Sequence, residues 1–515
     1  MRLGIDFGTT RTIVAQVDRG NYPVVTFFDT EGDPHDYFPS VVACRDGILL
    51  FGFEAQAAAA DGAPLLRSVK RTLAAPDVTM DTPVRIGSHS FAVAQVISGF
   101  LAAVREALTT ASSLTARGLA ADAAGATLSA VVAVPAHAHG TQRFLTLDAF
   151  RRAGFTVLAM MNEPSAAGFE YTHRQGRTLN SKRTRVIVYD LGGGTFDASL
   201  IRGDGTDHEV LGSLGLNHLG GDDFDHALAE TAIGLAGVAH NSLNDAAYAL
   251  LLDECREVKE HLSPQTKRLV VDVADLPVTV PVADFAAAST PLVEATIEAM
   301  RPLIGGLDSD APELTDVAGI YLVGGASTLP LVSRLLKARF GRRVFRSPYP
   351  AASTAIGLAI AADPDAGYSL TDRLSRGFGV FREASAGRSL HFDEIITRDE
   401  ALSATRDVVI TRRYPAAHNI GWFRFVEYSA LDASGQPKGD LVPFAEVVFP
   451  FDPHLETLDE PTLRGHTVSR IGHGPMIEER YAVDRYGIVS VTITNLDTGH
   501  RRTHSLGLSG ATQSV

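Results

Sequence analysis

The chain contains one short plan twice: an apolar strand that ends in Asp, a glycine turn with Thr, and a second strand. Residues 4–10 read GIDFGTT and residues 188–195 read VYDLGGGT. One such segment is typical of an ordinary hairpin. Two in one chain indicate duplicated lobes that face a common ligand. This repeat constrains the fold more than any other feature of the sequence.

The bulk composition indicates a large globular chain with excess negative charge. Its 515 residues exceed what one compact core holds, so two or more domains are expected. A hydrophobic content of 45% supplies ample apolar material to bury. The formal net charge of −14 argues against nucleic acid as a partner, because phosphate contacts need a surplus of Lys and Arg.

Cysteine usage and the first residues bear on the compartment. Cys44 and Cys255 are too few for a disulfide scaffold or a structural zinc site, and they fit a reducing cytoplasm. The start, MRLGIDFGTT, shows no charged leader followed by an apolar stretch, and no apolar run is long enough to span a bilayer. We therefore expect a cytoplasmic protein without a membrane partner.

Residues 1–365 alternate apolar strand-like runs with amphipathic helical stretches, a pattern typical of an α/β domain. Strands are predicted at 129–134, 185–189 and 319–323, and helices at 93–111, 141–153, 244–262 and 329–340. A polar, turn-rich stretch at 366–373 is predicted to be a linker. From 374 to 508 short alternating segments predict a small all-β sandwich, with one hairpin turn at 497–499. No helical lid is expected after it.

The repeated turns carry groups that suit a phosphate chain. Glycine turns place consecutive backbone N–H groups on one side, where they form a concavity for phosphate oxygens. Asp6 and Asp190 end the preceding strands, and two carboxylates beside a triphosphate repel it unless a divalent cation lies between them. Mg²⁺ keeps several waters in such sites, so both acids suit it through bridging water. Thr9, Thr10 and Thr195 supply hydroxyl donors.

A third glycine turn, at residues 323–326, ends a strand and precedes the helix predicted at 329–340. A helix N-terminus that is reached through glycines suits the inner phosphates and sugar of a nucleotide. By itself this segment favours a plain strand-to-helix turn. Together with the other two turns it predicts ligand contact.

With these motifs the chain resembles the 70-kDa heat-shock chaperones (Hsp70, DnaK-like) of the sugar kinase/actin/chaperone superfamily. The resemblance covers nearly the whole chain. Its motifs occur in the expected order: GIDFGTT (4–10), VKR (69–71), VAVPAHAHGTQR (132–143), NEPSAAG (162–168), YDLGGGTFDASL (189–200), NHLGGDDFD (217–225), VKEHLS (258–263) and LVGGAST (322–328). It implies a two-lobed actin-like (ribonuclease H-like) ATPase fold followed by the β sandwich.

The resemblance also implies slow hydrolysis of ATP to ADP, with Mg²⁺ and with K⁺ as a further candidate ion. The candidate catalytic residues are Lys70, Glu163, Asp190, Thr195 and Asp197. The candidate nucleotide-binding residues are Gly8, Thr9, Thr10, Arg11, Gly192, Gly193, Gly194, Gly220, Gly221, Arg256, Lys259, Ser263, Gly324, Gly325, Ala326 and Thr328. The implied partners are a peptide or unfolded client protein, gated by the nucleotide and held by the β domain, and cochaperones.

The adenine side departs from the family pattern. The family clamps adenine with an Arg where this chain has Thr328, and it carries Glu and Arg where this chain has Arg256 and Glu260. This exchange fits a surface ion pair at i,i+4 worth about 0.3–0.5 kcal/mol. The sharper hypothesis is that Arg256 stacks on adenine in place of the missing arginine. Weaker nucleotide binding than in typical relatives is expected.

The linker and the β domain also depart from the pattern. Relatives carry a run of leucines where residues 366–372 read AGYSLTD, which predicts weaker docking, since each buried CH₂ contributes about 0.8 kcal/mol. Pro135 and Arg143 match a pair that relays nucleotide state in the family. The aromatic residues of 414–453 either join the core, which we favour, or line an apolar cleft: Trp422, Phe423, Phe425, Tyr428 and Phe444.

Other functions fit parts of the sequence. A nucleotide-gated interaction or scaffold module would show little turnover, and a small-molecule kinase on the same fold would phosphorylate sugars. The extra β domain and the motif around Lys70 weigh against the kinase. A filament former is disfavoured because nothing in the sequence marks polymer contacts.

Overall fold

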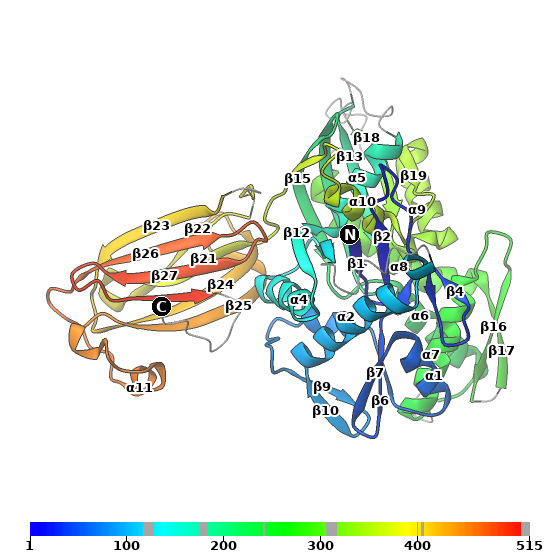
Figure 1. Cartoon of the computed structure of the whole chain (residues 1–515), viewed down its shortest axis with the longest axis horizontal. Helices are drawn as coiled ribbons and strands as arrows, with labels where there is room; N and C mark the ends of the chain where they lie inside the picture. The colour runs from blue at the N-terminus through cyan, green and yellow to red at the C-terminus, as the bar shows by residue number, and fades with distance from the viewer. Residues whose placement is uncertain are drawn as a thin grey trace.

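The computed structural model describes residues 1–116, 128–175, 183–239, 243–274, 276–304, 317–398, 400–402 and 406–505. Figure 1 shows two units, a two-lobed α/β unit and an elongated β sandwich beside it. The predicted fold class is confirmed by this architecture. The last residues predicted for the sandwich, 506–508, lie outside the described residues.

Lobe I is built on a five-stranded sheet in the order β12-β11-β1-β2-β5. β1 pairs antiparallel with β2 and parallel with β11, which pairs parallel with β12. β1 and β11 are buried along most of their length, as expected for central strands that are covered on both faces. The bounds are β1 (Arg2–Phe7), β2 (Arg11–Gln16), β5 (Phe38–Pro39), β11 (Ser129–Val134), β12 (Thr156–Asn162), α2 (Val93–Thr110) and α4 (Gly140–Arg152).

Shorter elements complete lobe I. β6, β7 and β8 form a small sheet beside α1, and β9 pairs with β10. The bounds are β3 (Phe27–Phe28), β4 (Pro34–His35), β6 (Val41–Arg45), β7 (Ile48–Phe51), α1 (Gly52–Ala60), β8 (Leu65–Arg67), the 3₁₀ helix η1 (Val69–Ala74), β9 (Pro83–Ile86), β10 (His89–Ala92) and α3 (Ser113–Ala116).

Lobe II is built on a six-stranded sheet in the order β19-β18-β13-β14-β15-β20. β13 and β14 pair antiparallel, as β1 and β2 do in lobe I, so the repeated sequence plan forms equivalent hairpins. The strands are β13 (Arg185–Leu191), β14 (Phe196–Asp204), β15 (Asp207–Leu216), β16 (Arg268–Val273), β17 (Leu276–Pro281), β18 (Val317–Val323) and β19 (Val344–Arg346). The helices are α6 (Gly221–Ala236), α7 (Asp245–Glu260), α8 (Val282–Ala299), η5 (Arg301–Leu303), η7 (Gly325–Thr328), α9 (Pro330–Phe340) and η8 (Gly341–Arg343).

Two closely packed helices join the lobes. α10 (Ser353–Ala362) packs on β1 and β2, whereas α5 (Glu163–Gln175) packs on β13 and β14, and the helices pack on each other. A Cβ at Gly357 of α10 would lie 1.7 Å from the carbonyl oxygen of Ala166 in α5. Only glycine fits this approach, so the crossing fixes the helices and with them the base of the space between the lobes.

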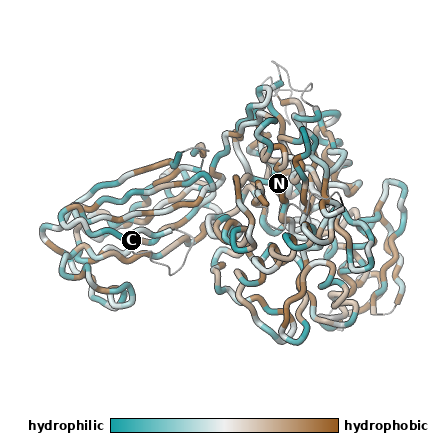
Figure 2. Tube along the Cα trace, viewed as in Figure 1, coloured by the Kyte–Doolittle hydropathy of each residue, from teal (hydrophilic) through white to brown (hydrophobic). Residues whose placement is uncertain are grey.

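The sandwich consists of two four-stranded antiparallel sheets, β22-β21-β24-β25 and β23-β26-β27-β28. β27 alternates buried with half-buried residues, and Figure 2 shows brown and teal alternating along the sandwich strands. The bounds are β21 (Gly377–Ala384), η9 (Ser385–Gly387), β22 (Ser389–Ile396), β23 (Val408–Pro415), β24 (Ile420–Leu431), β25 (Pro437–Pro450), η10 (Pro453–Leu455), α11 (Glu460–Gly465), β26 (Met476–Val483), β27 (Val489–Asn495) and β28 (Arg501–Ser505).

The aromatic residues of β24 and β25 divide between core and surface. Phe423, Phe425, Tyr428 and Phe444 are buried, as the favoured core interpretation predicts. Trp422 is 38% exposed and lies beneath the Arg464 guanidinium, 5.8 Å from the ring centroid. Four of the five aromatic residues are therefore buried, and Trp422 lies at the surface.

The linker adds an edge strand to lobe II. β20 (Ser369–Thr371) pairs in parallel with β15, and the Ser369 N–H donates to the Thr206 carbonyl (3.1 Å). Tyr368 stacks on His208 with ring centroids 5.6 Å apart. Backbone pairing and ring stacking thus dock a linker that has few leucines. Its docking strength relative to that of relatives stays a prediction.

One end of the sandwich packs on lobe I. Tyr486 and Ile488 are buried within the hydrophobic core of lobe I, and the Tyr486 hydroxyl donates to the Val157 carbonyl (3.1 Å). The Gly140 N–H at the start of α4 donates to both carboxylate oxygens of Glu427 (2.9 and 3.0 Å). The two units therefore share apolar core and buried polar contacts.

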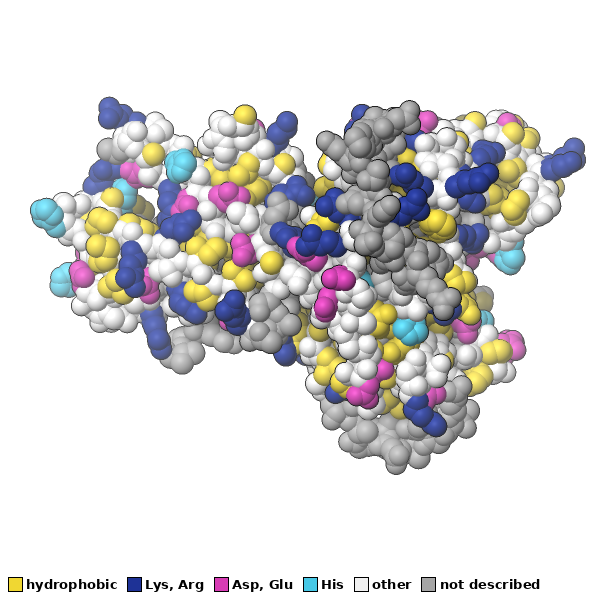
Figure 3. Space-filling model, turned by 90° about the horizontal axis from the view of Figure 1, so that it is seen from above, with side chains coloured by type: hydrophobic (Ala, Val, Ile, Leu, Met, Phe, Trp, Pro, Cys, Tyr) yellow, Lys and Arg dark blue, Asp and Glu magenta, His cyan; other side chains and the backbone are white. Residues whose placement is uncertain are grey.

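The surface mixes side chains of both signs. On the face in Figure 3, basic and acidic side chains are interspersed with scattered hydrophobic ones. Within the described ranges, none of the helices combines the length and the hydropathy that a membrane span needs.

Candidate nucleotide-binding site

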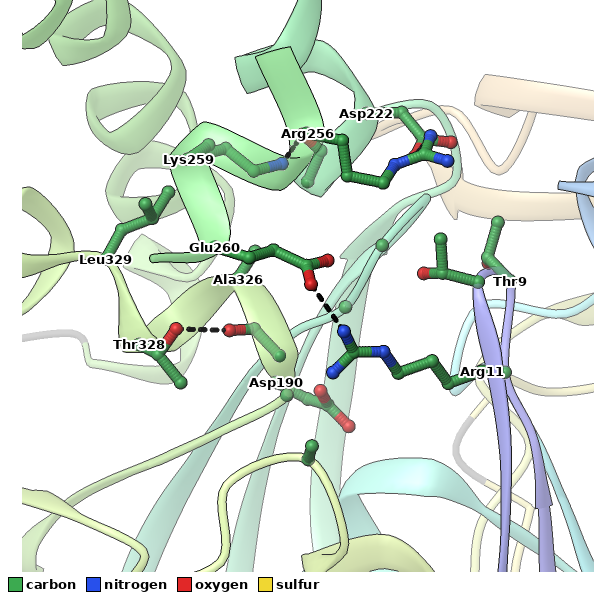
Figure 4. Close-up of a pocket in the computed structure, with 18 of the residues that line it drawn as sticks. Thr9, Arg11, Asp190, Asp222, Arg256, Lys259, Glu260, Ala326, Thr328 and Leu329 are labelled. Carbon is green, nitrogen blue, oxygen red and sulfur yellow. Dashed lines mark hydrogen bonds and ion pairs between the residues drawn. The ribbon is translucent and has the colours of Figure 1, made fainter. Parts of the chain in front are cut away.

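A cavity of about 1210 Å³ lies between the two lobes. Its walls come from the turn after β1, the turn after β13, the turn after β18 with η7, and the C-terminal part of α7. Figure 4 shows side chains from both lobes pointing into it. The two repeated turns thus face a common space, as the sequence predicts.

Most of the predicted site residues line this cavity. They are Asp6, Gly8, Thr9, Thr10, Arg11, Lys70, Glu163, Asp190, Gly192, Gly193, Thr195, Gly221, Arg256, Lys259, Ser263, Gly324, Gly325, Ala326 and Thr328. Gly194, Gly220 and Asp197 do not belong to its lining. Gly194 and Gly220 pack against each other behind the wall, and Asp197 accepts the His137 N–H (3.2 Å) on the side of the β domain.

The glycines allow the turns to meet at backbone distance. A Cβ at Gly193 would lie 2.2 Å from Thr10 Oγ1 of the other lobe. Gly324 has a φ of 85°, and its Cβ would lie 2.4 Å from Asp190 Oδ1. Side chains at these positions would fill the cradle that the turns form. The three turns therefore form one concavity.

Acidic side chains cluster around one lysine at the base of the cavity. Lys70 is buried and donates to Glu163 Oε1 at 2.6 Å. Burial and the Glu163 carboxylate raise the pKa of Asp6 to about 7 and that of Asp197 to about 8. The same two causes raise the pKa of Asp190, which also faces Asp6. Burial alone would lower the pKa of Lys70, but the carboxylates of Glu163 and Asp6 raise it.

This cluster fits a divalent cation. Asp6 adds to the cost of ionising Asp190, and a bound Mg²⁺ would offset this cost. Within the described residues, no three His, Cys, Asp or Glu side chains are arranged to hold a metal ion by themselves. Asp6 and Asp190 are the residues that would hold Mg²⁺, through its water, beside the phosphates.

The end of the cavity that the sequence predicts to hold adenine contains small and polar side chains. The Thr328 hydroxyl donates to the Gly325 carbonyl (2.7 Å), and Ala326 is buried beside it. Lys259 is buried, donates to the Gly221 carbonyl (2.6 Å) and pairs with Asp225 (2.6 Å). Lys259 therefore ties α7 to the start of α6 and faces the cavity.

Arg256 and Glu260 do not pair with each other as the i,i+4 interpretation supposes. Arg256 bonds to Asp222 (3.1 Å) and Asp225 (3.3 Å), so its guanidinium is held by two carboxylates at the cavity wall. Glu260 instead forms an ion pair with Arg11 of lobe I (Figure 4). Stacking of Arg256 on adenine stays a prediction, and it requires the plane of this held guanidinium to face the base.

Sequence reasoning missed some residues of the cavity wall. Asp222 accepts hydrogen bonds from Ser68 (2.8 Å) and Arg71 (3.4 Å), so it joins the lobes as well as holding Arg256. The sequence did contain a signal for Asp222: the motif at 217–225 has two adjacent acids, and they lie in the first turn of α6. Tyr37, which lies under the Arg11 guanidinium, carried no signal in the sequence.

Of the two predicted relay residues, Arg143 lies at the boundary with the β domain, and Pro135 is buried directly after β11. Arg143 is buried and donates to the Tyr486 carbonyl (3.4 Å) and to Asn162. Asn162 donates to Asp372 of the linker (3.0 Å). Arg143 therefore contacts the sandwich directly and the linker through one side chain, whereas its role as a relay stays a prediction.

Two lobes around a cavity, with glycine turns on equivalent hairpins, define a protein of the two-lobed actin-like class. The family model of the Hsp70 protein matches residues 2–374. The chain belongs to the Hsp70 family. The chaperone protein HscA of Cronobacter sakazakii is 32% identical over 514 residues, which cover 96% of this chain and 76% of that protein.

Two further relatives are similar over about three quarters of the chain. The chaperone protein HscA homolog of Tolumonas auensis is 34% identical over 418 residues, which cover 78% of this chain and 64% of that protein. HscA of Serratia proteamaculans is 36% identical over 397 residues, or 73% of this chain and 61% of that protein. The chain thus spans less than two thirds of the length of these two relatives.

Proposed function

We propose that the chain is an ATP-binding and ATP-hydrolysing chaperone whose nucleotide state gates client binding by the β domain. The observation that carries this proposal is the convergence of three glycine turns and the acids Asp6 and Asp190 on one inter-lobe cavity. Backbone donors suit the phosphates, and the acids suit a hydrated Mg²⁺. We include K⁺ as a further candidate ion that binds with the nucleotide.

The chemistry rests on positioning and electrostatics, since phosphoryl transfer leaves little covalent work to the protein. Mg²⁺ would neutralise phosphate charge when bound. Lys70 supplies a fixed cation beside the terminal phosphate, and Thr195 supplies a hydroxyl donor. Glu163 fixes Lys70, and Asp197 lies behind the wall, where it orders the loop before α4.

Coupling to the β domain is supported by a chain of polar contacts. Asp197 accepts the His137 N–H (3.2 Å), and the Arg376 guanidinium lies 3.3 Å from His137 Nε2. Arg376 also pairs with Glu427 of the sandwich (3.5 Å), which binds the Gly140 N–H. A change at the cavity that moves Asp197 would reach the β domain through this chain.

The remaining parts of the proposal concern organisation and partners. We infer an ATPase domain over 1–365, a linker over 366–373 and a client-binding domain over 374–508. A peptide or unfolded client would bind the sandwich, and cochaperones would modulate the cycle. A cytoplasmic location rests on the buried free thiols Cys44 and Cys255, which suit a reducing compartment.

Steady-state ATP turnover by the full chain tests the proposal, measured with and without a permanently unfolded protein such as reduced carboxymethylated lactalbumin. We expect slow turnover that the unfolded protein accelerates. Nucleotide binding without turnover would favour the scaffold function instead. Turnover that the unfolded protein leaves unchanged would contradict the proposed gating.

A further inference from the structure

Within the described residues, ion pairs of one polarity link the two lobes. Each pair places an arginine on lobe I and a carboxylate on α6 or α7 of lobe II. The pairs are Arg11 with Glu260, Arg67 with Asp253 (2.5 Å), and Arg71 with both Asp222 (3.4 Å) and Asp223 (3.7 Å). Contacts of this kind favour the closed arrangement of the lobes.

The pair of Arg11 and Glu260 differs from the other pairs in position. Both residues line the nucleotide cavity, and Figure 4 shows their side chains meeting across it. Arg11 begins β2 directly after Thr10, whereas Glu260 ends α7 beside Lys259. The bridge therefore spans from the phosphate turn of lobe I to the helix that borders the adenine end.

Arg11 is held in this position from the lobe I side. Its guanidinium lies 4.5 Å from the centroid of the Tyr37 ring, which also lines the cavity. The side chains of Arg11 and Glu260 are each 38% exposed, so this ion pair lies at the solvent-facing side of the cavity. Separation of the pair would therefore remove a contact that joins the two walls of the cavity.

We propose that Arg11 and Glu260 are positioning residues that close lobe II over the bound nucleotide and slow its release. The proposal rests on the function proposed above, because it takes the occupant of the cavity to be a nucleotide. The size of the effect follows from exposure: a half-exposed ion pair shifts an equilibrium by about two- to fivefold. High salt weakens such a pair, so release should accelerate with ionic strength.

Release of the fluorescent analogue MANT-ADP from the full chain, followed by stopped flow in low salt with excess unlabelled ADP, tests this role. Glu260→Ala is expected to accelerate release by about two- to fivefold. The same substitution made in an Arg11→Ala background is expected to change nothing, because the partner is already absent. Glu298→Ala is the control: it removes an exposed pair with Arg301 (2.6 Å) that lies within lobe II.

The outcomes separate this inference from the proposed function. Unchanged release in Glu260→Ala, or equal acceleration by that substitution in both backgrounds, would overturn the bridge while leaving nucleotide binding intact. Failure of the wild-type chain to bind MANT-ADP would overturn both. A merely structural role would lower the thermal unfolding temperature of Glu260→Ala without altering release, which also overturns the bridge.

Discussion

In the proposed function, catalysis depends most directly on Lys70. It is buried among carboxyl groups and bonded to Glu163, so its charge is fixed in place before any phosphate arrives. We predict that Lys70→Ala lowers kcat for ATP hydrolysis by about 10²-fold, because a preorganised charge at the terminal phosphate is lost. Single-turnover hydrolysis of radiolabelled ATP measures this. Mg·ATP binding is expected to persist.

Lys267→Ala serves as the matched control, because Lys267 is exposed and lies outside the cavity. A kcat for Lys70→Ala within twofold of the wild-type value would remove Lys70 from the catalytic machinery. Circular dichroism of both variants checks that the chain is folded.

Single residues were predictable where a local pattern carries the chemistry. The glycines of the three turns and the acids that end β1 and β13 line one cavity because each sits at a fixed offset from a strand end. The partner of Glu260 was not predictable, because Arg11 lies 249 positions away and only the closed lobes bring the two together. Sequence spacing offered Arg256, four positions before Glu260, as the partner. In the structure Arg256 pairs with Asp222 and Asp225 instead.

At the scale of the elements, a histidine beside the linker strand β20 makes the stability of the fold depend on pH. His208 is buried and stacks on Tyr368, and burial lowers its pKa below the ordinary 6.5. The unfolded chain therefore binds a proton more readily than the folded one. This contribution to stability is present above pH 6.5 and is lost as pH falls through 6.5 toward the folded value, by up to about 1.4 kcal/mol per pH unit.

We predict that His208→Phe removes this part of the pH dependence while it keeps the ring contact with Tyr368. Guanidinium unfolding of the variant and the wild type between pH 5 and 8 measures the difference in slope. Exposed His391→Phe is the control. Parallel pH profiles for His208→Phe and the wild type would refute this account of the linker.

Long elements followed from periodicity, and short ones did not. The helix predicted at 244–262 is α7 (Asp245–Glu260), and the strand predicted at 129–134 has the bounds of β11. β20 has only three residues, Ser369–Thr371, which are too few to show an alternating pattern. The sequence therefore predicts a linker at this position. Its pairing with β15 comes from tertiary contact, which sequence pattern does not encode.

At the scale of the whole molecule, Glu427 holds the two units together. Its carboxylate binds the N-terminus of α4 and pairs with Arg376, and all of these groups are buried. We predict that Glu427→Ala separates the β domain from lobe I, because the buried Gly140 N–H loses its carboxylate acceptor at a cost of about 1–3 kcal/mol. Small-angle X-ray scattering is expected to show a larger radius of gyration.

Glu446→Ala is the control for this experiment, because Glu446 pairs with exposed Arg424 on the outer face of the same sheet. An unchanged scattering profile for Glu427→Ala would show that the apolar contacts of Tyr486 and Ile488 hold the units without it.

In the proposed function, nucleotide binding depends on three glycine turns that form one concavity between the two lobes. Titration calorimetry of Mg·ATP into the full chain and into Gly193→Val tests it most directly, because a side chain at Gly193 would collide with Thr10 Oγ1 at 2.2 Å. We predict one site per wild-type chain, with a dissociation constant above the low nanomolar range, and affinity at least about tenfold weaker in the variant. No heat with the wild type, or equal affinity in both, would contradict the account.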